Sequence, residues 1–326
     1  MSLANFVATI ARGPSRGRSL TVDEAHAAMT VILTGEAEPE AIGAFLMVLR
    51  YRGETPEELA GFSLALRDVL PGWTGAVPAV DWPCYAAGRT RGLPWFLLSA
   101  RLVALAGLPV LLHGWNAFQT PVASVRDALP GLGIPVAATP DEAGTLLRDH
   151  GIAYLPLEAM SRRVFDLIRL REVLGLRSIL NTAVRMMNPG HASCVVQGVF
   201  HPAYRPLQQE AARIVGLQNL AIIKGGGGEF ERHPAKDVTV YGLREGAEFR
   251  EAYPALRDDH RRLSESTEDP AALDRLWRGE STEPFATAIV LGTAALALEA
   301  RGAAAPGGGL DLARRLWADR AVHVAA

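Results

Sequence analysis

The sequence predicts an α/β protein with a mostly parallel central sheet and a smaller helical domain at its start. The first seventy residues contain amphipathic helical patterns only, whereas short apolar runs alternate with helical segments after residue 76. The chain has 326 residues, of which 49% are hydrophobic, and this is enough for one large domain or two medium ones.

Capping motifs mark the helices at the start of the chain. Thr21 and Glu24 have the spacing of a capping box, in which a hydroxyl caps the helix and a glutamate reaches back. Thr55, Pro56 and Glu58 begin another helix in the same way, with proline at the first helical position. Such short amphipathic helices must pack on the remaining chain or on a second subunit. We expect a homodimer, because these helices carry more apolar surface than they can bury alone.

The second part of the chain has the alternating pattern of a parallel sheet. Residues 158–187 interrupt it with another helical stretch. Because strands that alternate with helices form βαβ units, we expect most of the sheet to be parallel. The expected strands are 77–82, 108–114, 134–138, 152–157, 194–200 and 220–224.

Composition restricts the cellular setting. Cys84 and Cys194 provide neither a disulfide framework nor the spacing of a metal site, which suits a reducing compartment. No apolar stretch of about 18 residues runs without charge, glycine or proline, and no signal-peptide core is present at the start. These features predict a cytoplasmic protein.

Arginine is distributed unevenly, although the formal net charge is only −2. Residues 84–126 contain four arginines and no acidic residue, and residues 159–185 contain six arginines against two acids. Lys224 and Lys236 are the only lysines. Charges separated along a chain can form a basic face, and arginine suits bidentate recognition of phosphate.

A glycine-rich stretch, Gly225 to Gly228, follows the last expected strand. It is not a P-loop, because no Lys-Ser or Lys-Thr follows it, and it lacks the third glycine of a dinucleotide-binding turn. A metal site would require adjacent carboxylates, whereas Phe230 separates Glu229 from Glu231. A simple connecting turn is one interpretation of this stretch, and the rest of the chain must decide between it and a binding loop.

Several longer motifs now resemble one family. The segments LPVLLHG, LREVLGLRSILN, NPGHASCVVQGVFHPAY and TAIVLGTAALALEA are similar to those of anthranilate phosphoribosyltransferase-like proteins, glycosyltransferase family 3. The resemblance implies a nucleoside phosphorylase/phosphoribosyltransferase-like fold and a homodimer through the helical domain. It assigns residues 1–74 and about 158–188 to that domain, and residues 75–157 and 189–326 to the α/β domain.

The family's catalytic motifs differ in this chain. The enzymes carry G-T-G-G-D after the first strand, where this chain has YAAGRTRG, residues 85–92. They carry K-H-G-N where Leu112 precedes His113 and Gly114, and an Asp-Glu magnesium pair where Phe230 precedes Glu231. A magnesium diphosphate requires several oxygen ligands. The resemblance therefore predicts no metal, no cofactor and no catalytic residues, with the donor site inactive.

The same departures look like the YbiB-type branch of the family, which is described as nucleic-acid-binding. This similarity predicts a cytoplasmic homodimer that binds DNA or RNA without sequence preference through an arginine-lined cleft between the domains. Arg171 also matches an arginine that contacts the aromatic acid in the enzymes. The predicted phosphate-binding residues are Arg89, Arg91, Arg162, Arg163, Arg171, Arg185 and Lys224, and the predicted ligand cleft contains Tyr85, His113 and Gly114.

Two alternatives stay open at this point. One is a glycosyltransferase, phosphoribosyltransferase or nucleoside phosphorylase-like enzyme with an altered donor site, in which Arg89 and Arg91 replace the missing lysine and metal. The other is a regulator that binds a small anion in an open cleft. Fold alone does not decide among them, because one fold supports many chemistries.

Overall fold

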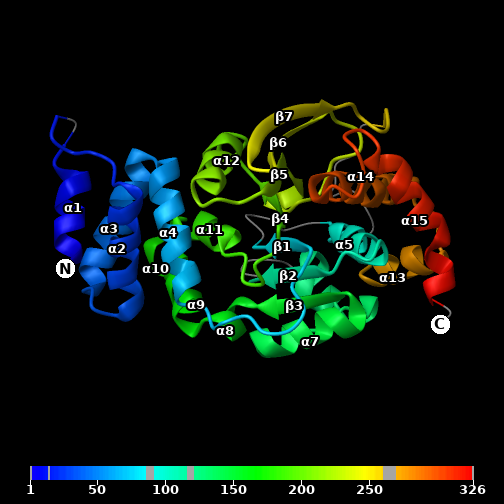
Figure 1. Ribbon diagram of the computed structural model, residues 1–326, viewed down its shortest axis with the longest axis horizontal. Helices are drawn as coiled ribbons and strands as arrows, with labels where there is room; N and C mark the ends of the chain where they lie inside the picture. Colours follow the sequence, from blue (N-terminus) through cyan, green and yellow to red (C-terminus); the bar gives the residue numbers. More distant parts are fainter. Residues whose placement is uncertain (1, 14, 86–91, 116–120, 260–268, 325–326) are drawn as a thin grey trace.

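A helical bundle and a larger α/β domain lie side by side along the longest axis of the molecule (Figure 1). The computed structural model describes residues 2–13, 15–85, 92–115, 121–259 and 269–324. The amino terminus lies at the free end of the bundle, and the carboxyl terminus lies at the far end of the α/β domain. This arrangement confirms the predicted fold class.

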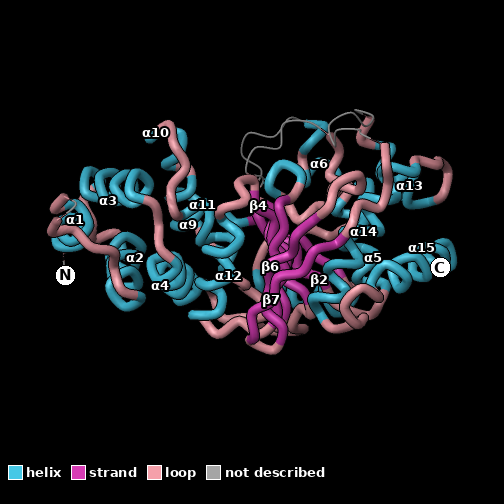
Figure 2. Tube along the Cα trace, turned by 90° about the horizontal axis from the view of Figure 1, so that it is seen from above, coloured by secondary structure: helices cyan, strands magenta, loops and turns pink. Residues whose placement is uncertain are grey.

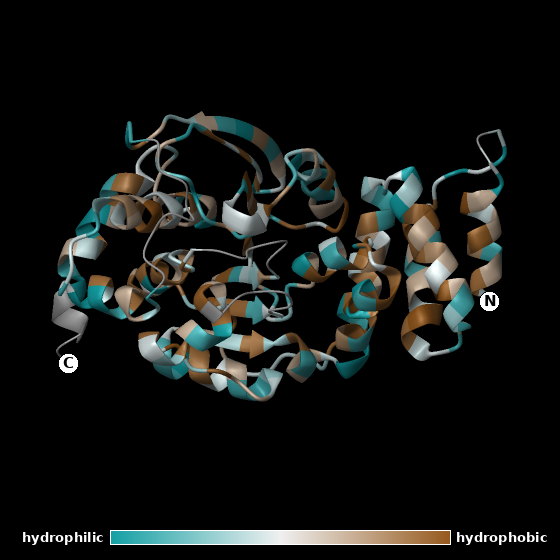
Figure 3. Cartoon of the chain, turned by 180° about the vertical axis from the view of Figure 1, so that it is seen from behind, coloured by the Kyte–Doolittle hydropathy of each residue, from teal (hydrophilic) through white to brown (hydrophobic). Residues whose placement is uncertain are grey.

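The helical bundle combines the first part of the chain with the stretch that follows β3. Its capping boxes are present as predicted, with Thr21 and Glu24 at one helix and Thr55 and Glu58 at another. Figure 3 shows hydrophobic and hydrophilic stretches alternating along these helices, as amphipathic packing requires. The helical elements are α1 (Leu3–Ala11), α2 (Val22–Thr34), α3 (Pro39–Arg52), α4 (Pro56–Asp68), α8 (Leu157–Met160), α9 (Arg162–Ile168), α10 (Leu170–Leu174), α11 (Leu180–Ala183) and η3 (Val184–Met186).

The central sheet has seven strands in the order β3-β2-β1-β4-β5-β6-β7. The first five are parallel, and the last two are antiparallel to their neighbours. Figure 2 shows the strands stacked in the middle of this domain with helices on both sides. The strands are β1 (Val80–Cys84), β2 (Val110–Gly114), β3 (Ile152–Pro156), β4 (Cys194–Val199), β5 (Asn219–Lys224), β6 (Val238–Arg244) and β7 (Ala247–Tyr253).

Two hydrophobic clusters cover the sheet, and one of them continues into the helical bundle. The long helix α14 has the length and composition of a membrane span, but 72% of that window is buried inside the fold, so it is a core helix here. The remaining helical elements are α5 (Phe96–Leu105), η1 (Pro121–Ala123), α6 (Val125–Ala128), η2 (Pro130–Leu132), α7 (Pro140–His150), α12 (Tyr204–Ile214), η4 (Gly226–Gly228), α13 (Ala271–Arg278), α14 (Pro284–Arg301) and α15 (Gly309–Val324).

One sequence expectation about the sheet was wrong, and one feature of the sheet was missed. The run 134–138 forms only an isolated parallel bridge, between Val136 and Tyr154. The hairpin formed by β6 and β7 was not expected, although Glu245 and Gly246 at its turn both have positive φ, as a two-residue hairpin turn requires.

Candidate active site

The order of the sheet reverses between β1 and β4, and this switch point is where α/β proteins bind ligands. β1 pairs with β2 along its whole length, but with β4 only at Val80 and Asp81. The carboxyl-terminal halves of β1 and β4 therefore are not paired with each other. The loops after β1 and β2 contain residues 86–91 and 116–120, which lie outside the described residues.

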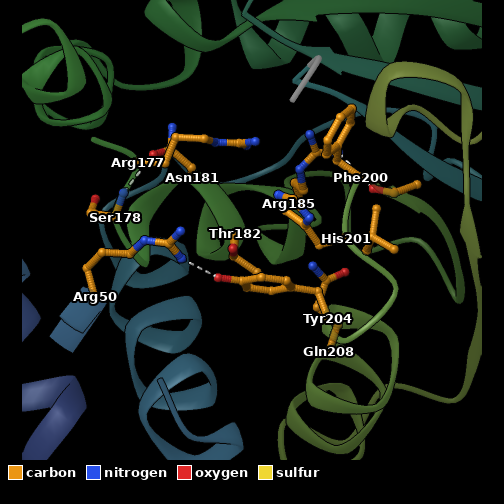
Figure 4. A pocket seen from close by; sticks show the side chains of 12 residues that line it. Arg50, Arg177, Ser178, Asn181, Thr182, Arg185, Phe200, His201, Tyr204 and Gln208 are labelled. Atoms are coloured by element: carbon orange, nitrogen blue, oxygen red, sulfur yellow. Dashed lines mark hydrogen bonds between the residues drawn. The ribbon is translucent and has the colours of Figure 1, made fainter. Parts of the chain in front are cut away.

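A pocket of about 70 Å³ lies beside the carboxyl end of β4, between the two domains. The helical bundle contributes side chains from α3, α11 and η3, and the α/β domain contributes the end of β4 and the start of α12 (Figure 4). The lining residues are Arg50, Arg177, Ser178, Asn181, Thr182, Arg185, Gly198, Val199, Phe200, His201, Tyr204 and Gln208.

Three arginines give this pocket a positive electrostatic character. Burial, and after it the charges of Arg185, Arg171 and Arg50, lower the pKa of Arg177 to about 10. With this pKa, the Arg177 guanidinium is cationic near neutral pH. A buried cation whose pKa is depressed by neighbouring cations in a pocket marks a candidate anion-binding site.

A tyrosine connects the two domains at the edge of the pocket. Arg50 Nη1 donates to the Tyr204 hydroxyl at 2.8 Å (Figure 4), and that hydroxyl donates to Glu54 Oε2 at 3.4 Å. Burial raises the pKa of Glu54 and of Tyr204 above their ordinary values. These contacts fix the Arg50 guanidinium, which comes from α3, against α12 of the other domain.

Arg185 lies at the inner wall of the pocket and is only 3% exposed. Its Nη1 donates to the carbonyl oxygens of Gly198 and Gly228 at 3.1 and 3.0 Å, so it joins β4 to the glycine-rich stretch. Burial lowers its pKa, whereas the nearby Glu229 carboxylate raises it. Gln197 Nε2 donates to the Arg185 carbonyl at 3.0 Å and holds the backbone in place.

A buried polar chain connects the ends of β1 and β2. The Tyr85 hydroxyl and His113 Nδ1 are 3.0 Å apart, and His113 Nε2 and Asp81 Oδ2 are 3.2 Å apart. His113 and Asp81 have no exposed surface, and burial raises the pKa of Tyr85 well above its ordinary value. Gly114 is required by packing, because a Cβ there would lie 1.9 Å from the Cys84 carbonyl oxygen. The predicted ligand cleft at Tyr85, His113 and Gly114 is therefore interior structure.

The glycine-rich stretch forms a turn that places the following residues in the core. The Phe230 ring packs edge-on to Trp82 at 5.4 Å, and Glu231 Oε2 accepts the backbone N–H of Phe96 at 3.0 Å. Both glutamates, Glu229 and Glu231, are fully buried and neither lines the pocket. Among the described residues, no group of three acidic, histidine or cysteine side chains could hold a metal. As the fold places them, Glu229 and Glu231 do not fit the magnesium ion that the enzymes of the resembled family hold at this place.

The predicted phosphate-binding arginines do not form one open groove in the described part of the chain. Arg162 is exposed but pairs with Asp166 at 3.1 Å, and Arg163 Nη2 donates to the Ile32 carbonyl at 2.6 Å. Arg171 does not line the pocket, but its charge lowers the pKa of Arg177, which does. Lys224 is exposed at the end of β5. The remaining two predicted residues, Arg89 and Arg91, lie outside the described residues.

The sequence analysis missed three residues that shape the pocket, namely Arg50, Arg177 and Tyr204. Arg177 could have been identified from the sequence, because it belongs to the segment LREVLGLRSILN that carries the family resemblance. The contact of Arg50 with Tyr204 joins residues 154 positions apart, and no local pattern in the sequence indicates it.

Comparison with known proteins identifies the class. Residues 8–69 match the helical bundle domain of the glycosyl transferase family, and residues 96–319 match its a/b domain. The chain therefore belongs to glycosyl transferase family 3, and the predicted family is confirmed.

The relatives point to one kind of enzyme within that family. The anthranilate phosphoribosyltransferase of Symbiobacterium thermophilum is 32% identical over 254 residues, covering 76% of this chain and 72% of the relative. The anthranilate phosphoribosyltransferase of Geobacillus sp. is 31% identical over 301 residues, covering 89% of this chain and 87% of the relative.

Solved structures show the same fold. The anthranilate phosphoribosyltransferase of Thermus thermophilus superimposes with a TM-score of 0.82 at 23% identity, covering 99% of this chain and 97% of that one. The Saccharomyces cerevisiae enzyme, in complex with PRPP and Mg, superimposes with a TM-score of 0.78 at 17% identity, covering 98% of this chain and 95% of that one.

The predicted function was wrong. Relatives and structural neighbours are anthranilate phosphoribosyltransferases, and this overturns the interpretation as a non-catalytic nucleic-acid-binding protein. The YbiB-type branch is not supported by these relatives. Physically, the prediction treated Arg162, Arg163 and Arg185 as free cations, whereas the fold engages them in an ion pair and in bonds to backbone carbonyls.

Proposed function

We propose that the protein is a pentosyl transferase that moves a phosphorylated pentosyl group from a diphosphate donor to a small acidic acceptor. The observation that carries this proposal is the convergence of Arg50, Arg177 and Arg185 on one interdomain pocket beside the end of β4. The relatives are named for transfer to anthranilate, an aromatic acid, and guanidinium groups suit both carboxylate and phosphate oxygens.

The chemistry requires stabilisation of negative charge. With anthranilate as acceptor, a bond forms between its amine nitrogen and the anomeric carbon of the pentosyl group. The bond from that carbon to the diphosphate oxygen breaks. The electron pair stays on the diphosphate, and the proton of the acceptor nitrogen passes to water. Cations that are already fixed by burial and by hydrogen bonds stabilise such charge without reorganising. Arg185 is fixed both by burial and by its bonds to two carbonyl groups. Arg50 is exposed and is held by its hydrogen bond to Tyr204.

The direct test is an assay of the purified protein with phosphoribosyl diphosphate and anthranilate, followed by other aromatic and heteroaromatic acids. Consumption of acceptor, read from fluorescence or absorbance, should match release of diphosphate one to one. We expect turnover with at least one acid. Binding of acids without any diphosphate release would instead favour a small-anion regulator and would contradict the proposal.

We also propose that turnover needs little magnesium, because Glu231 binds the Phe96 backbone and Phe230 fills the core. Adding a chelator should change the rate by no more than about twofold, since the carboxylates that a hard cation prefers are not presented. The yeast enzyme solved with PRPP and Mg is a suitable comparison, assayed in parallel. Loss of activity on chelation, restored by added magnesium, would show that a metal site exists elsewhere.

We propose further that the protein is a cytoplasmic homodimer that associates through the helical bundle. Tyr51 on α3 and Val173 on α10 are 95% and 82% exposed, and Leu176 just after α10 is 55% exposed. Large apolar side chains left exposed on one domain are candidates for an association surface. Light scattering at low micromolar concentration should give twice the chain mass, and Val173→Asp should give a monomer. Val77→Asp, at an exposed valine outside the bundle, is the matched control. A monomeric wild-type protein would refute this.

A further inference from the structure

A second cavity, of about 270 Å³, lies in the α/β domain between α5, η2 and α13. It shares no lining residue with the interdomain pocket. Its walls include Arg101 from α5, Trp277 and Arg278 from α13, and two glycines beside η2, Gly131 and Gly133. A Cβ at either glycine would meet nothing within 4 Å, so this side of the cavity is open.

Two arginines, Arg101 and Arg278, line the cavity against one acid, Asp274. The Arg101 guanidinium lies 4.1 Å from the centroid of the Trp277 ring, which fixes its position by a cation–π contact. The only acid that lines the cavity, Asp274, is bound by Arg278 Nε at 2.9 Å. No hydrogen bond joins Arg101 to an acceptor within the described residues. Burial lowers the pKa of Arg101 to about 10, which leaves it cationic at neutral pH.

Trp277 provides a second, independent observation. Its side chain is 2% exposed, and its Nε1–H is buried with no hydrogen-bond acceptor in the described part of the chain. A buried donor without an acceptor costs free energy, so natural proteins usually satisfy it with a ligand or water. Trp277 is one of the residues that line the cavity, beside Arg101.

We propose that this cavity is a second binding site, which takes the carboxylate or phosphate group of a small metabolite. An oxyanion would accept hydrogen bonds from Arg101 and from Trp277 Nε1, and it would balance the charge that Asp274 leaves unmatched. Both oxyanions offer several acceptor oxygens in the geometry that a guanidinium recognises. The cavity volume exceeds what a single water molecule fills, so there is room for the rest of the metabolite.

The test is isothermal titration calorimetry with inorganic phosphate and, separately, with benzoate. The protein carries Arg177→Gln, so that binding in the interdomain pocket is weakened. In this background, Arg101→Met should raise Kd about tenfold, because it removes a charge-assisted hydrogen bond but keeps an apolar stem on Trp277. Trp277→Phe should raise Kd about threefold, because it removes only the neutral donor. The probe that binds more tightly identifies the ligand class.

Arg314→Gln is the matched control, because Arg314 is an exposed arginine on α15 that pairs with Asp311. It should leave Kd unchanged. Melting curves check that each variant is folded. If the Arg101→Met protein is not folded, the Kd of Trp277→Phe alone tests the proposal. The proposal is overturned if neither probe binds, which would mean that the cavity holds water only. It is also overturned if Arg101→Met and Trp277→Phe bind as tightly as their parent.

Discussion

Replacing Arg177 with glutamine is expected to lower kcat/KM of the transferase reaction by about a hundredfold or more. The guanidinium lines the interdomain pocket and is surrounded by Arg50, Arg171 and Arg185. Removing one fixed donor that stabilises developing negative charge typically has an effect of this size. Steady-state kinetics with a saturating and a limiting acid acceptor measure the change and separate a loss in KM from a loss in kcat.

The same substitution should not lower stability, and this separates a binding role from a structural one. Burial and the neighbouring cations depress the pKa of Arg177, so its charged form is disfavoured in the folded protein. Because a cationic group with a depressed pKa opposes folding below that pKa, removing the charge should leave Tm unchanged or raise it slightly. A fall in activity with a fall in Tm would point instead to a packing role.

Arg148→Gln is the control for this substitution. Arg148 lies on α7, its side chain is 61% exposed, and it pairs only weakly with the adjacent Asp149 at 3.5 Å. Its removal should leave kcat/KM within about twofold of the wild type, since exposed ion pairs contribute little. If Arg177→Gln were as active as this control, the interdomain pocket would not be the substrate site.

Local patterns in the sequence were sufficient to predict much of the fold. Capping boxes at Thr21 and Thr55 mark helix starts through neighbouring residues, and apolar runs mark the buried strands. The hairpin was missed at β7, which lies at the sheet edge and carries several charged residues, so its apolar signal is weak. The run 134–138 was overpredicted because the chain there leaves the sheet after one bridge.

The candidate site was harder to predict than the fold, because its chemistry depends on burial and on distant contacts. Arg185 was expected to face phosphate, but in the fold it bonds two backbone carbonyls and is 3% exposed. His113 was expected in a ligand cleft, but Asp81 and Tyr85 enclose it. The pocket instead depends on Arg50 and Tyr204, which lie in different domains. Counts of charge along the sequence cannot distinguish an arginine that faces a pocket from one that is bonded to backbone carbonyls in the interior.

Replacing Gly198 with alanine is expected to destabilise the protein by about 3 kcal/mol, since overpacking against backbone cannot be relieved by side-chain movement. A Cβ at Gly198 would lie 2.0 Å from the carbonyl carbon of Glu229 and 2.1 Å from its oxygen. β4 and the glycine-rich turn would have to separate. This would also break the bonds by which Arg185 joins Gly198 to Gly228. Urea denaturation measures the change in the free energy of unfolding.

Because Gly198 lies at the pocket wall, transferase activity should fall together with stability in this variant. Gly72→Ala is the matched control, since a Cβ there meets nothing within 4 Å and its backbone φ is not positive. That control should be as stable as the wild type or slightly more so, because alanine restricts the unfolded chain. A Gly198→Ala protein with wild-type stability would mean that β4 and the turn after β5 are not in this close contact, and the structural basis for placing Arg185 at the pocket wall would then fail.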